Sequence, residues 1–472
     1  MSLLSLRIKK LHFVGIGGIG MSGIAEVMKA MGYEVTGSDL AKTEITDHLE
    51  DVGIPVVEGH AAGNVADVDV VVISSAVNNA NPEVLAARER LIPVIRRAEM
   101  LGELMRLKFS IGVCGTHGKT TTTSMLGHIL AVAGYDPTLI VGGRLISIET
   151  NAKLGQSDYL VAEADEYDRS FLDLFPSLAV ATNLEPEHLD CYRDFRDLSD
   201  SFAAFLNRVP FYGTVVYNAD CPGLRAIIPD VKRPLLPFGF GTYARIRGVN
   251  KKSEGRSGSF DFAVEDKVLG TIQLNIPGAH NLENALAAGA CAWDARVPFA
   301  VIQKALASFS GVVRRFEIKG VANGVTVVDD YAHHPTEVRA ALNTGKAYAK
   351  GRLIAVFQPH LFSRTRFFYR EFAAALEIAD EIILAEIYPS REEPVPGVDS
   401  GLILDVFRKH DNVRACYEPQ LAAIPARVAE RARPGDVVMT VGAGSVYRLG
   451  PEILAAINRQ SSTSQSKKEI NS

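Results

Sequence analysis

Cysteine is scarce in this chain of 472 residues. The five cysteines stand far apart, at Cys114, Cys191, Cys221, Cys291 and Cys416, and no two of them form a C-x-x-C pair. This spacing excludes a disulfide framework and a zinc site built on paired cysteines. Scattered thiols are typical of a reducing compartment, so we expect a cytoplasmic protein.

Long apolar runs and a strong charge of one sign are also missing. No apolar run approaches the ~20 residues of a membrane span. Residues 1–10 carry charges without the apolar core of a signal peptide. The formal net charge is −5, with acidic and basic residues interspersed. We therefore expect no membrane insertion and no nucleic-acid partner.

The chain length and the order of strand-like and helical segments predict three domains and a C-terminal tail. Residues 1–108 alternate apolar strands with helical segments, which is typical of a doubly wound α/β domain. A second domain, residues 109–313, opens in the same way and changes to short strands and turns between residues 214 and 276. A third α/β domain covers residues 314–458. Residues 459–472 are rich in Ser, Gln and Lys, which predicts a disordered tail.

A glycine-rich turn, G-I-G-G-I-G from Gly15, follows the first predicted strand and opens a helix. Asp39 ends the second strand, and Ser74 and Ser75 end a later one. This pattern matches the dinucleotide fingerprint, in which a diphosphate lies at the helix N-terminus. Taken alone, it invites an NAD-dependent dehydrogenase, although glycines there also serve close helix–strand packing, and the serines also fit a simple turn.

The segment G-T-H-G-K-T-T-T, residues 115–122, is the most informative stretch of the chain. It lies between an apolar strand, residues 109–114, and a helical pattern. In this layout backbone N–H groups face the phosphates of a nucleoside triphosphate, Lys119 reaches the β/γ oxygens and the Thr120 hydroxyl meets Mg²⁺. The strict pattern would place a glycine at Val113, so the loop is a variant. We expect Lys119 on its solvent side.

Acidic and histidine side chains follow two further apolar strands. Glu163 begins E-A-D-E at the carboxyl end of one strand, where proteins with a phosphate loop hold Mg²⁺. The structural alternative is a surface acidic turn. His188 follows Asn183 in N-L-E-P-E-H-L-D, and a histidine among carboxylates can bind a metal or orient a substrate. A lone histidine is more often a plain loop residue.

Other candidate ligand residues begin a helix or lie near the third domain. Asn281 and Asn284, beside His280, have amides suited to a purine edge, while Asn281 also suits a helix cap. Arg315, at the domain junction, could neutralise charge on a transferring phosphoryl group. Two more segments with His and Arg follow strands, at residues 329–337 and 357–365.

These segments, in this order, resemble the Mur ligases, ATP-dependent enzymes that form amide bonds in peptidoglycan synthesis. The resemblance extends from about residue 10 to residue 457, and the series is far more specific than any one motif. Its motifs are G-I-G-G-I-G-M-S-G from Gly15, S-S-A from Ser74, P-V-I-R-R-A-E-M-L from Pro93, G-T-H-G-K-T-T-T-T from Gly115, E-A-D-E from Glu163, H-N-x-x-N from His280, R-R-F from Arg314, D-D-Y-A-H-H-P-T-E from Asp329 and Q-P-H from Gln358.

The resemblance implies an α/β protein of three domains, in which Rossmann-like N- and C-terminal domains flank a central P-loop ATPase domain. The first would bind a UDP-sugar, and the last would bind an amino acid and close over the site. The best match is to members that join L-alanine to the lactyl carboxylate of UDP-N-acetylmuramate. ATP would phosphorylate that carboxylate, and the amine would attack the acyl phosphate, leaving ADP and phosphate. The turn at Gly15 would hold the UDP diphosphate.

The resemblance also implies roles for individual residues. Those for ATP are Gly115, Thr116, His117, Gly118, Lys119, Thr120, Thr121, His280, Asn281, Asn284, Arg315 and Asp330. Those for Mg²⁺ are Thr120, Glu163 and, at a second ion, His188. Those for the other substrates are Gly17, Gly18, Ser38, Asp39, Ser74, Ser75, Asn183, Tyr331, His333, His360 and Arg364. Lys119, His188, Arg315 and His333 are expected to act in catalysis.

One departure from the wider family bears on the substrate. Several Mur ligases carry a carbamoylated lysine shortly after the metal-site histidine, but residues 185–212 contain no Lys. This favours the alanine-adding members. The alternative within the family is the ligase that recycles murein tripeptides, against which Tyr331 and the Q-P-H segment argue. An alternative of a different class is a protein in which ATP gates domain closure and no amide forms.

Overall fold

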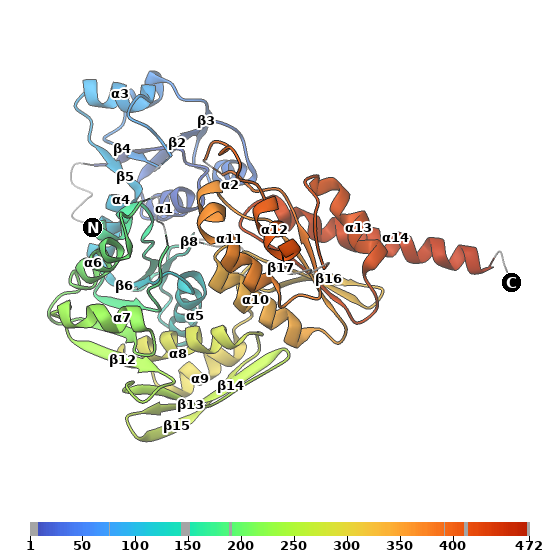
Figure 1. Ribbon diagram of the computed structural model, residues 1–472. Coiled ribbons are helices and arrows are strands. Elements are labelled where there is room, and N and C mark those ends of the chain that lie inside the picture. Colours follow the sequence, from blue (N-terminus) through green and yellow to red (C-terminus); the bar gives the residue numbers. More distant parts are fainter. Residues whose placement is uncertain are drawn as a thin grey trace. The chain divides into compact units, whose positions relative to one another are not determined.

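The computed structural model describes residues 8–74, 76–142, 152–187, 191–390, 392–409 and 414–469 (Figure 1). These residues form three sheets with helices between the strands, which confirms the predicted α/β class. By its internal contacts the chain divides into two compact units. The first comprises Met1–Lys251, Phe260–Gln273 and Glu283–Ser310, and the second comprises Lys252–Ser259, Leu274–Leu282 and Gly311–Ser472.

The first sheet is parallel and has the order β3-β2-β1-β4-β5. Its strands are β1 (Lys10–Val14), β2 (Glu34–Asp39), β3 (Val56–Glu58), β4 (Val70–Ile73) and β5 (Val94–Arg96). Its helices are α1 (Ile19–Ala30), α2 (Glu44–Asp51), η2 (Ala62–Val65), α3 (Pro82–Glu89) and α4 (Arg97–Arg106). Leu11 and Phe13 of β1 point into one core, and Val14 packs in another with Ala86 and Ala87 of α3. Burial on both faces explains why such strands are continuously apolar.

The second sheet has the order β15-β14-β13-β12-β11-β10-β6-β9-β7-β8. Its strands are β6 (Phe109–Cys114), β7 (Thr138–Ile140), β8 (Ala152–Lys153), β9 (Tyr159–Glu163), β10 (Leu178–Ala181), β11 (Thr214–Asn218), β12 (Leu235–Gly239), β13 (Ile246–Glu254), β14 (Ser257–Val264) and β15 (Lys267–Leu274). Its helices are α5 (Lys119–Val132), η3 (Tyr167–Asp173), α6 (Phe195–Leu206), α7 (Pro222–Ile227), η4 (Ile228–Asp230), α8 (Ala279–Asp294) and α9 (Phe299–Ser308).

The first two sheets share one hydrophobic core, although the sequence predicts a domain boundary after residue 108. Phe13 of β1 and Phe171 of η3 both belong to this core. A Cβ on Gly102 of α4 would lie 2.2 Å from the carbonyl oxygen of Asp173, so only glycine allows this approach. The described residues before Phe109 and the sheet after them therefore pack as one body.

The third sheet has the order β16-β17-β21-β18-β19-β20 and is parallel except for the β16–β17 pair. Its strands are β16 (Glu317–Ala322), β17 (Val325–Asp330), β18 (Leu353–Phe357), β19 (Glu381–Leu384), β20 (Ala415–Tyr417) and β21 (Val437–Val441). Its helices are α10 (Pro335–Tyr348), α11 (Phe362–Leu376), α12 (Gly401–Lys409), η5 (Leu421–Ala423), α13 (Ile424–Arg431), η6 (Ser445–Arg448) and α14 (Leu449–Glu469).

The C-terminal segment differs from its prediction. Helix α14 continues to Glu469, whereas composition predicts disorder from residue 459. Neither Gly nor Pro interrupts residues 459–469, so nothing in their backbone chemistry ends the helix.

Among the described residues, no helix is both long and apolar enough to cross a bilayer.

Candidate active site

The phosphate loop leaves the carboxyl end of β6, between two strands that end at the same level. Val113 pairs with Glu163 of β9, and Cys114 pairs with Ala181 of β10. Because the carboxyl ends of parallel strands share one edge of a sheet, the loop and Glu163 meet there. The predicted strand, loop and helix order is therefore confirmed.

Two glycines of the loop adopt conformations that side chains rarely allow. Gly115 has φ +138° and Gly118 has φ +78°. A Cβ at Gly118 would lie 2.3 Å from Asn284 Oδ1, and one at Gly115 would lie 2.0 Å from Thr182 Oγ1. Both positions require glycine, so the loop backbone can turn tightly before α5 begins at Lys119.

The segment after β10 holds the loop in shape. Asn183 Oδ1 accepts the His117 N–H at 2.8 Å, and Asn183 Nδ2 donates to the His117 carbonyl at 3.0 Å. Thr182 Oγ1 donates to the same carbonyl at 2.6 Å. The sequence predicts Asn183 as a substrate contact, but in this structure both ends of its amide bind the loop backbone.

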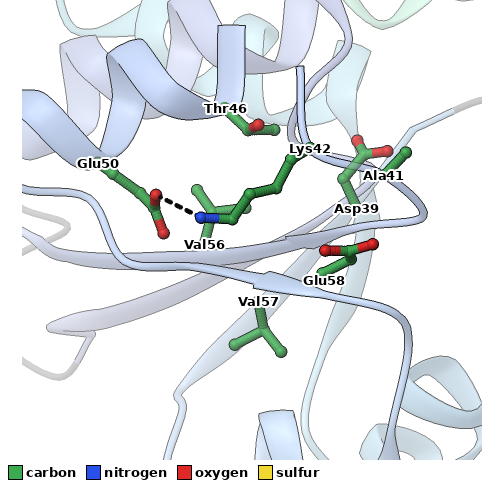
Figure 2. Close-up of a pocket in the computed structure, with 8 residues that line it drawn as sticks. All are labelled: Asp39, Ala41, Lys42, Thr46, Glu50, Val56, Val57 and Glu58. Carbon is green, nitrogen blue, oxygen red and sulfur yellow. Dashed lines mark hydrogen bonds and ion pairs between the residues drawn. The ribbon is translucent and has the colours of Figure 1, made fainter. Parts of the chain in front are cut away.

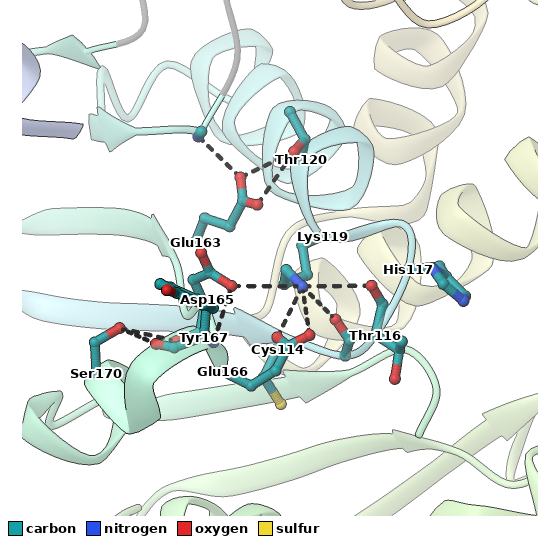
Figure 3. Close-up of polar contacts among 12 residues, drawn as sticks. Cys114, Thr116, His117, Lys119, Thr120, Glu163, Asp165, Glu166, Tyr167 and Ser170 are labelled. Atoms are coloured by element: carbon teal, nitrogen blue, oxygen red, sulfur yellow. Dashed lines mark hydrogen bonds and ion pairs between the residues drawn. The ribbon is translucent and has the colours of Figure 1, made fainter. Parts of the chain in front are cut away.

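Lys119 is buried and forms an ion pair, which corrects the expectation that it lies on the solvent side. Its side chain is 12% exposed. Its Nζ donates to Glu166 at 2.7 and 2.9 Å and to the Gly115 carbonyl at 2.8 Å (Figure 3). Asp165 lies 3.8 Å from the same nitrogen. The Thr116 carbonyl accepts from this nitrogen at 3.4 Å, so two loop carbonyls surround the ammonium.

Burial and charge act in opposite directions on this pair. Burial by itself would lower the pKa of Lys119, but the carboxylates of Glu166 and Asp165 outweigh it and raise that pKa above its ordinary value. Burial raises the pKa of Glu166, and the Lys119 ammonium limits the rise. Lys119 therefore carries its positive charge beside the phosphate loop.

Thr120 and Glu163 offer oxygen atoms to a divalent cation. Thr120 Oγ1 lies 3.0 and 3.2 Å from the two carboxylate oxygens of Glu163 (Figure 3). The Gly142 N–H donates to Glu163 Oε2 at 2.8 Å, which fixes the carboxylate. Hydroxyl and carboxylate oxygens are ligands that Mg²⁺ prefers, so these residues fit the predicted ion.

The helix α8 presents the residues predicted near an adenine. Asn284 Oδ1 accepts from Thr122 Oγ1 at 3.3 Å, which places Asn284 beside α5 and the loop. Asn281 does not cap the helix, because α8 begins two residues earlier, at Ala279. Its Nδ2 donates to the Pro277 carbonyl at 2.7 Å. His188 and Ser75 lie outside the described residues.

The first sheet collects the residues predicted for the UDP-sugar at its carboxyl edge, except for Ser75. Val14 pairs with both Ser38 and Ile73, so the turn at Gly15 lies level with Ser38 and with Ser74. The Gly17 N–H, beside Gly18, donates to Asp39 Oδ2 at 2.7 Å. Figure 2 shows the shallow crevice that Asp39 lines. Its other lining residues are Ala41, Lys42, Thr46, Glu50, Val56, Val57 and Glu58.

The second unit brings four predicted residues together after β17 and β18. The rings of Tyr331 and His333 lie 5.3 Å apart, and those of His333 and His360 lie 6.1 Å apart. Arg364, which is buried, has its Nη1 3.2 Å from His360 Nδ1. The cluster combines a guanidinium with two imidazoles, which are groups that recognise a carboxylate.

Sequence reasoning missed two residues of these sites. Tyr388, in the loop after β19, stacks on His360 with ring centres 5.7 Å apart and an angle of 15° between the rings. Its position just after a parallel strand is the only signal for it. Glu166, the partner of Lys119, stands in the E-A-D-E motif three residues after Glu163, where a carboxylate that faces the loop could have been proposed.

Asp330 and Arg315 lie near the start of the third sheet. Asp330 accepts the N–H groups of Phe316 at 2.8 Å and Ala332 at 2.9 Å. Burial raises the pKa of Asp330 to about 6, against the opposing charge of Arg315. The Arg315 guanidinium lies 5.4 Å from the centre of the Tyr331 ring. In this structure Asp330 organises the backbone around the junction.

The fold and these sites define the class of protein. Three α/β sheets carry a glycine turn at the edge of the first, a phosphate loop with a buried lysine in the second and a cationic aromatic cluster in the third. A buried cation beside a loop of this kind serves nucleotide phosphates in α/β proteins. The class is that of P-loop nucleotide-binding α/β proteins.

The chain belongs to the Mur ligase family. Three models of that family match nearly the whole chain: "Mur ligase family, catalytic domain" over residues 10–109, "Mur ligase middle domain" over residues 113–292 and "Mur ligase, glutamate ligase domain" over residues 314–444. The three matches follow the three sheets in order, which confirms the three-domain architecture.

Relatives resemble the chain along its full length. It is 50% identical over 448 residues to the UDP-N-acetylmuramate–L-alanine ligase of Geotalea uraniireducens, covering 95% of this chain and 98% of the relative. The ligase of the same name from Salinibacter ruber is 47% identical, covering 97% of each. Among solved structures, the UDP-N-acetylmuramate–alanine ligase of Thermotoga maritima has a TM-score of 0.80 at 29% identity, covering 96% of this chain and 99% of that chain. A murein peptide ligase of Psychrobacter arcticus has a TM-score of 0.70 at 25% identity, covering 95% and 99%.

We predict that Lys119→Ala destabilises the protein, because it leaves Glu166 buried without its cation. The free energy of unfolding should fall by about 3–5 kcal/mol, as when one partner of a buried ion pair is removed. The double variant Lys119→Ala/Glu166→Gln should recover part of that loss. Urea unfolding followed by circular dichroism measures both.

The matched control is Lys42→Ala, which breaks an exposed pair with Glu50 at 3.1 Å. That change should cost less than about 1 kcal/mol. Equal losses for the Lys119 and Lys42 variants would contradict a buried pair at the phosphate loop.

Proposed function

We infer that this chain joins L-alanine to the lactyl carboxylate of UDP-N-acetylmuramate, coupled to the cleavage of ATP to ADP and phosphate. The product is UDP-N-acetylmuramoyl-L-alanine, a precursor of peptidoglycan. The observation that carries this inference is the identity of about half of all residues to alanine ligases, over nearly the full length of both chains. Identity at this level over all three domains supports a shared reaction as well as a shared fold.

Two alternatives are less well supported. Among the solved structures, the murein peptide ligase of Psychrobacter arcticus has a TM-score of 0.70, against 0.80 for the alanine ligase of Thermotoga maritima. A protein that uses ATP only to gate closure would not need the cluster of Arg364, His360 and His333 that suits an amino-acid carboxylate. The assay below distinguishes both alternatives from alanine ligation, because one requires a tripeptide in place of alanine and the other forms no amide.

The charge of the reactants explains what the phosphate loop supplies. A carboxylate and a triphosphate are both anions, and their repulsion must be offset before a phosphoryl group can move between them. Lys119 holds a positive charge at the N-terminus of α5, where the helix dipole adds to it. In this proposal phosphate oxygens take the place of Glu166 as acceptors for the ammonium.

Mg²⁺ fits the oxygen donors of Thr120 and Glu163, and His188 is proposed for a second ion. When bound, Mg²⁺ would neutralise phosphate charge as a Lewis acid. Thr120 and Glu163 would hold and orient it, and the Gly142 N–H keeps the carboxylate in place.

The remaining substrate contacts are assigned to the other sites. The glycine turn with Ser38, Asp39 and Ser74 would bind the UDP diphosphate, because backbone N–H groups at a helix N-terminus favour anions. Arg364, with His360, would bind the carboxylate of alanine. Tyr331 and His333 lie beside them, and His280, Asn281, Asn284, Arg315 and Asp330 are proposed for ATP.

The experiment that tests this function measures phosphate release from ATP with UDP-N-acetylmuramate, in the presence and absence of L-alanine. We expect release to require both substrates and the product to be heavier by one alanine residue. Release with a tripeptide but not with alanine would assign the chain to the recycling reaction. Release that depends on neither substrate would contradict a ligase.

His360→Ala should weaken the amino-acid site selectively. The KM for L-alanine should rise about tenfold, as expected for the loss of one hydrogen bond to a charged group, while the KM for ATP stays within about twofold. His128→Ala serves as the control, because it removes a histidine in the C-terminal half of α5 that contacts Ser308 on α9 and is not one of the predicted ligand residues. Equal effects on both KM values would argue against an amino-acid site at His360.

A further inference from the structure

A buried carboxylate lies beneath the glycine turn of the first sheet and belongs to none of the sites above. Glu83, in the first turn of α3, is completely buried. It accepts from Ser38 Oγ at 2.7 Å, Asn64 Nδ2 at 2.5 Å and the Ala61 N–H at 3.3 Å. These donors come from β2, from η2 and from the turn before η2, so one side chain joins separate segments.

Two histidines complete the surroundings of Glu83. His60 Nδ1 lies 3.3 Å from Glu83 Oε2 and 3.0 Å from Ser38 Oγ. His12 Nε2 lies 3.7 Å from the same carboxylate oxygen, and its Nδ1 lies 2.8 Å from Thr36 Oγ1. Burial alone would raise the pKa of Glu83, but His12, Ser38 and Asn64 outweigh it and hold that pKa at about 2. Glu83 is therefore an ionised acceptor at neutral pH.

Ser38 connects this network to the glycine turn. Its backbone carbonyl accepts the N–H groups of Gly15 at 2.8 Å and Ile16 at 3.1 Å. Gly15 has φ +76°, so the turn is tight and its two N–H groups converge on this oxygen. The next residue, Asp39, accepts the Gly17 N–H. The end of β2 thus sets the conformation of the turn through consecutive residues.

We propose that Glu83 is a positioning residue for the UDP-sugar: it fixes Ser38, and the Ser38 carbonyl fixes the glycine turn that binds the diphosphate. This rests on the proposed binding of UDP-N-acetylmuramate at that turn. A buried carboxylate is unfavourable unless donors surround it, and a position that needed only packing would be filled by an apolar side chain. Here the donors come from the strand and the turns beside the proposed site, so Glu83 acts on binding without touching the ligand.

Glu83→Gln tests this role because it keeps the shape of the side chain and replaces one acceptor oxygen by an NH₂ group. We expect the KM for UDP-N-acetylmuramate to rise about fivefold or more, with kcat and the KM values for ATP and L-alanine within about twofold. The affinity for UDP, measured by calorimetry on the full-length enzyme, should fall by a similar factor. Glu83→Asp, which keeps the charge, should restore part of it.

The matched control is Glu26→Gln. Glu26 on α1, a helix of the same domain, is a partly buried carboxylate that lies 3.5 Å from His48 Nε2. It should leave the KM for UDP-N-acetylmuramate unchanged. If Glu83→Gln fails to fold, Asn64→Ala removes a donor that holds Glu83, at a residue outside the proposed site, and should raise the same KM.

Gly17→Ala separates failure of this inference from failure of the site itself, since a Cβ there would lie 2.9 Å from Asp39 Oδ2. If Gly17→Ala raises the KM for UDP-N-acetylmuramate and Glu83→Gln does not, the positioning role is wrong and the site stands. If Glu83→Gln changes all three KM values alike, Glu83 is merely structural. If neither variant changes this KM, the glycine turn is not the UDP-sugar site.

Discussion

The ammonium of Lys119 is the interaction on which the central site depends. A buried cation is stable only among acceptors, and Glu166 with the Gly115 carbonyl supplies them in this structure. The same surroundings make the site receptive to phosphate, because an anion can take over from Glu166 without leaving the cation unpaired. The glycines, the αL backbone at Gly118 and the brace from Asn183 all serve to bring the loop to this side chain.

All three sheets position their proposed functional side chains in the same way. Each ends its parallel strands at one level and puts polar residues at the strand ends or just beyond them: Asp39 ends β2, Glu163 ends β9 and His360 follows β18. Rigid strands thereby position side chains that loops alone would leave mobile. Glu83 lies beneath the glycine turn of the first sheet and acts on that turn through Ser38, without contacting the ligand.

Most of the fold could be predicted from the sequence, because strands buried on both faces are continuously apolar and glycine or Pro-led segments mark where helices begin. The phosphate loop was predictable because its glycines and Lys119 stand between an apolar strand and a helical pattern. The motif could have suggested Glu166 as a carboxylate that faces the loop, but its direct pairing with Lys119 depends on how the turn after β9 folds back. The contact of the Asn183 amide with the His117 backbone could not be predicted either, because a motif does not reveal which loop a side chain faces. Tyr388 was missed because stacking partners become neighbours only when β18 and β19 pair.

The central claim is that the phosphate loop drives transfer of a phosphoryl group to a carboxylate. The most direct measurement uses UDP-N-acetylmuramate labelled with ¹⁸O in its lactyl carboxylate, turned over with ATP and L-alanine, and the mass of the phosphate released. The carboxylate oxygen that attacks phosphorus stays with phosphorus when the amine displaces it from carbon. The account predicts a single ¹⁸O in each phosphate, and unlabelled phosphate accompanied by amide formation would contradict it.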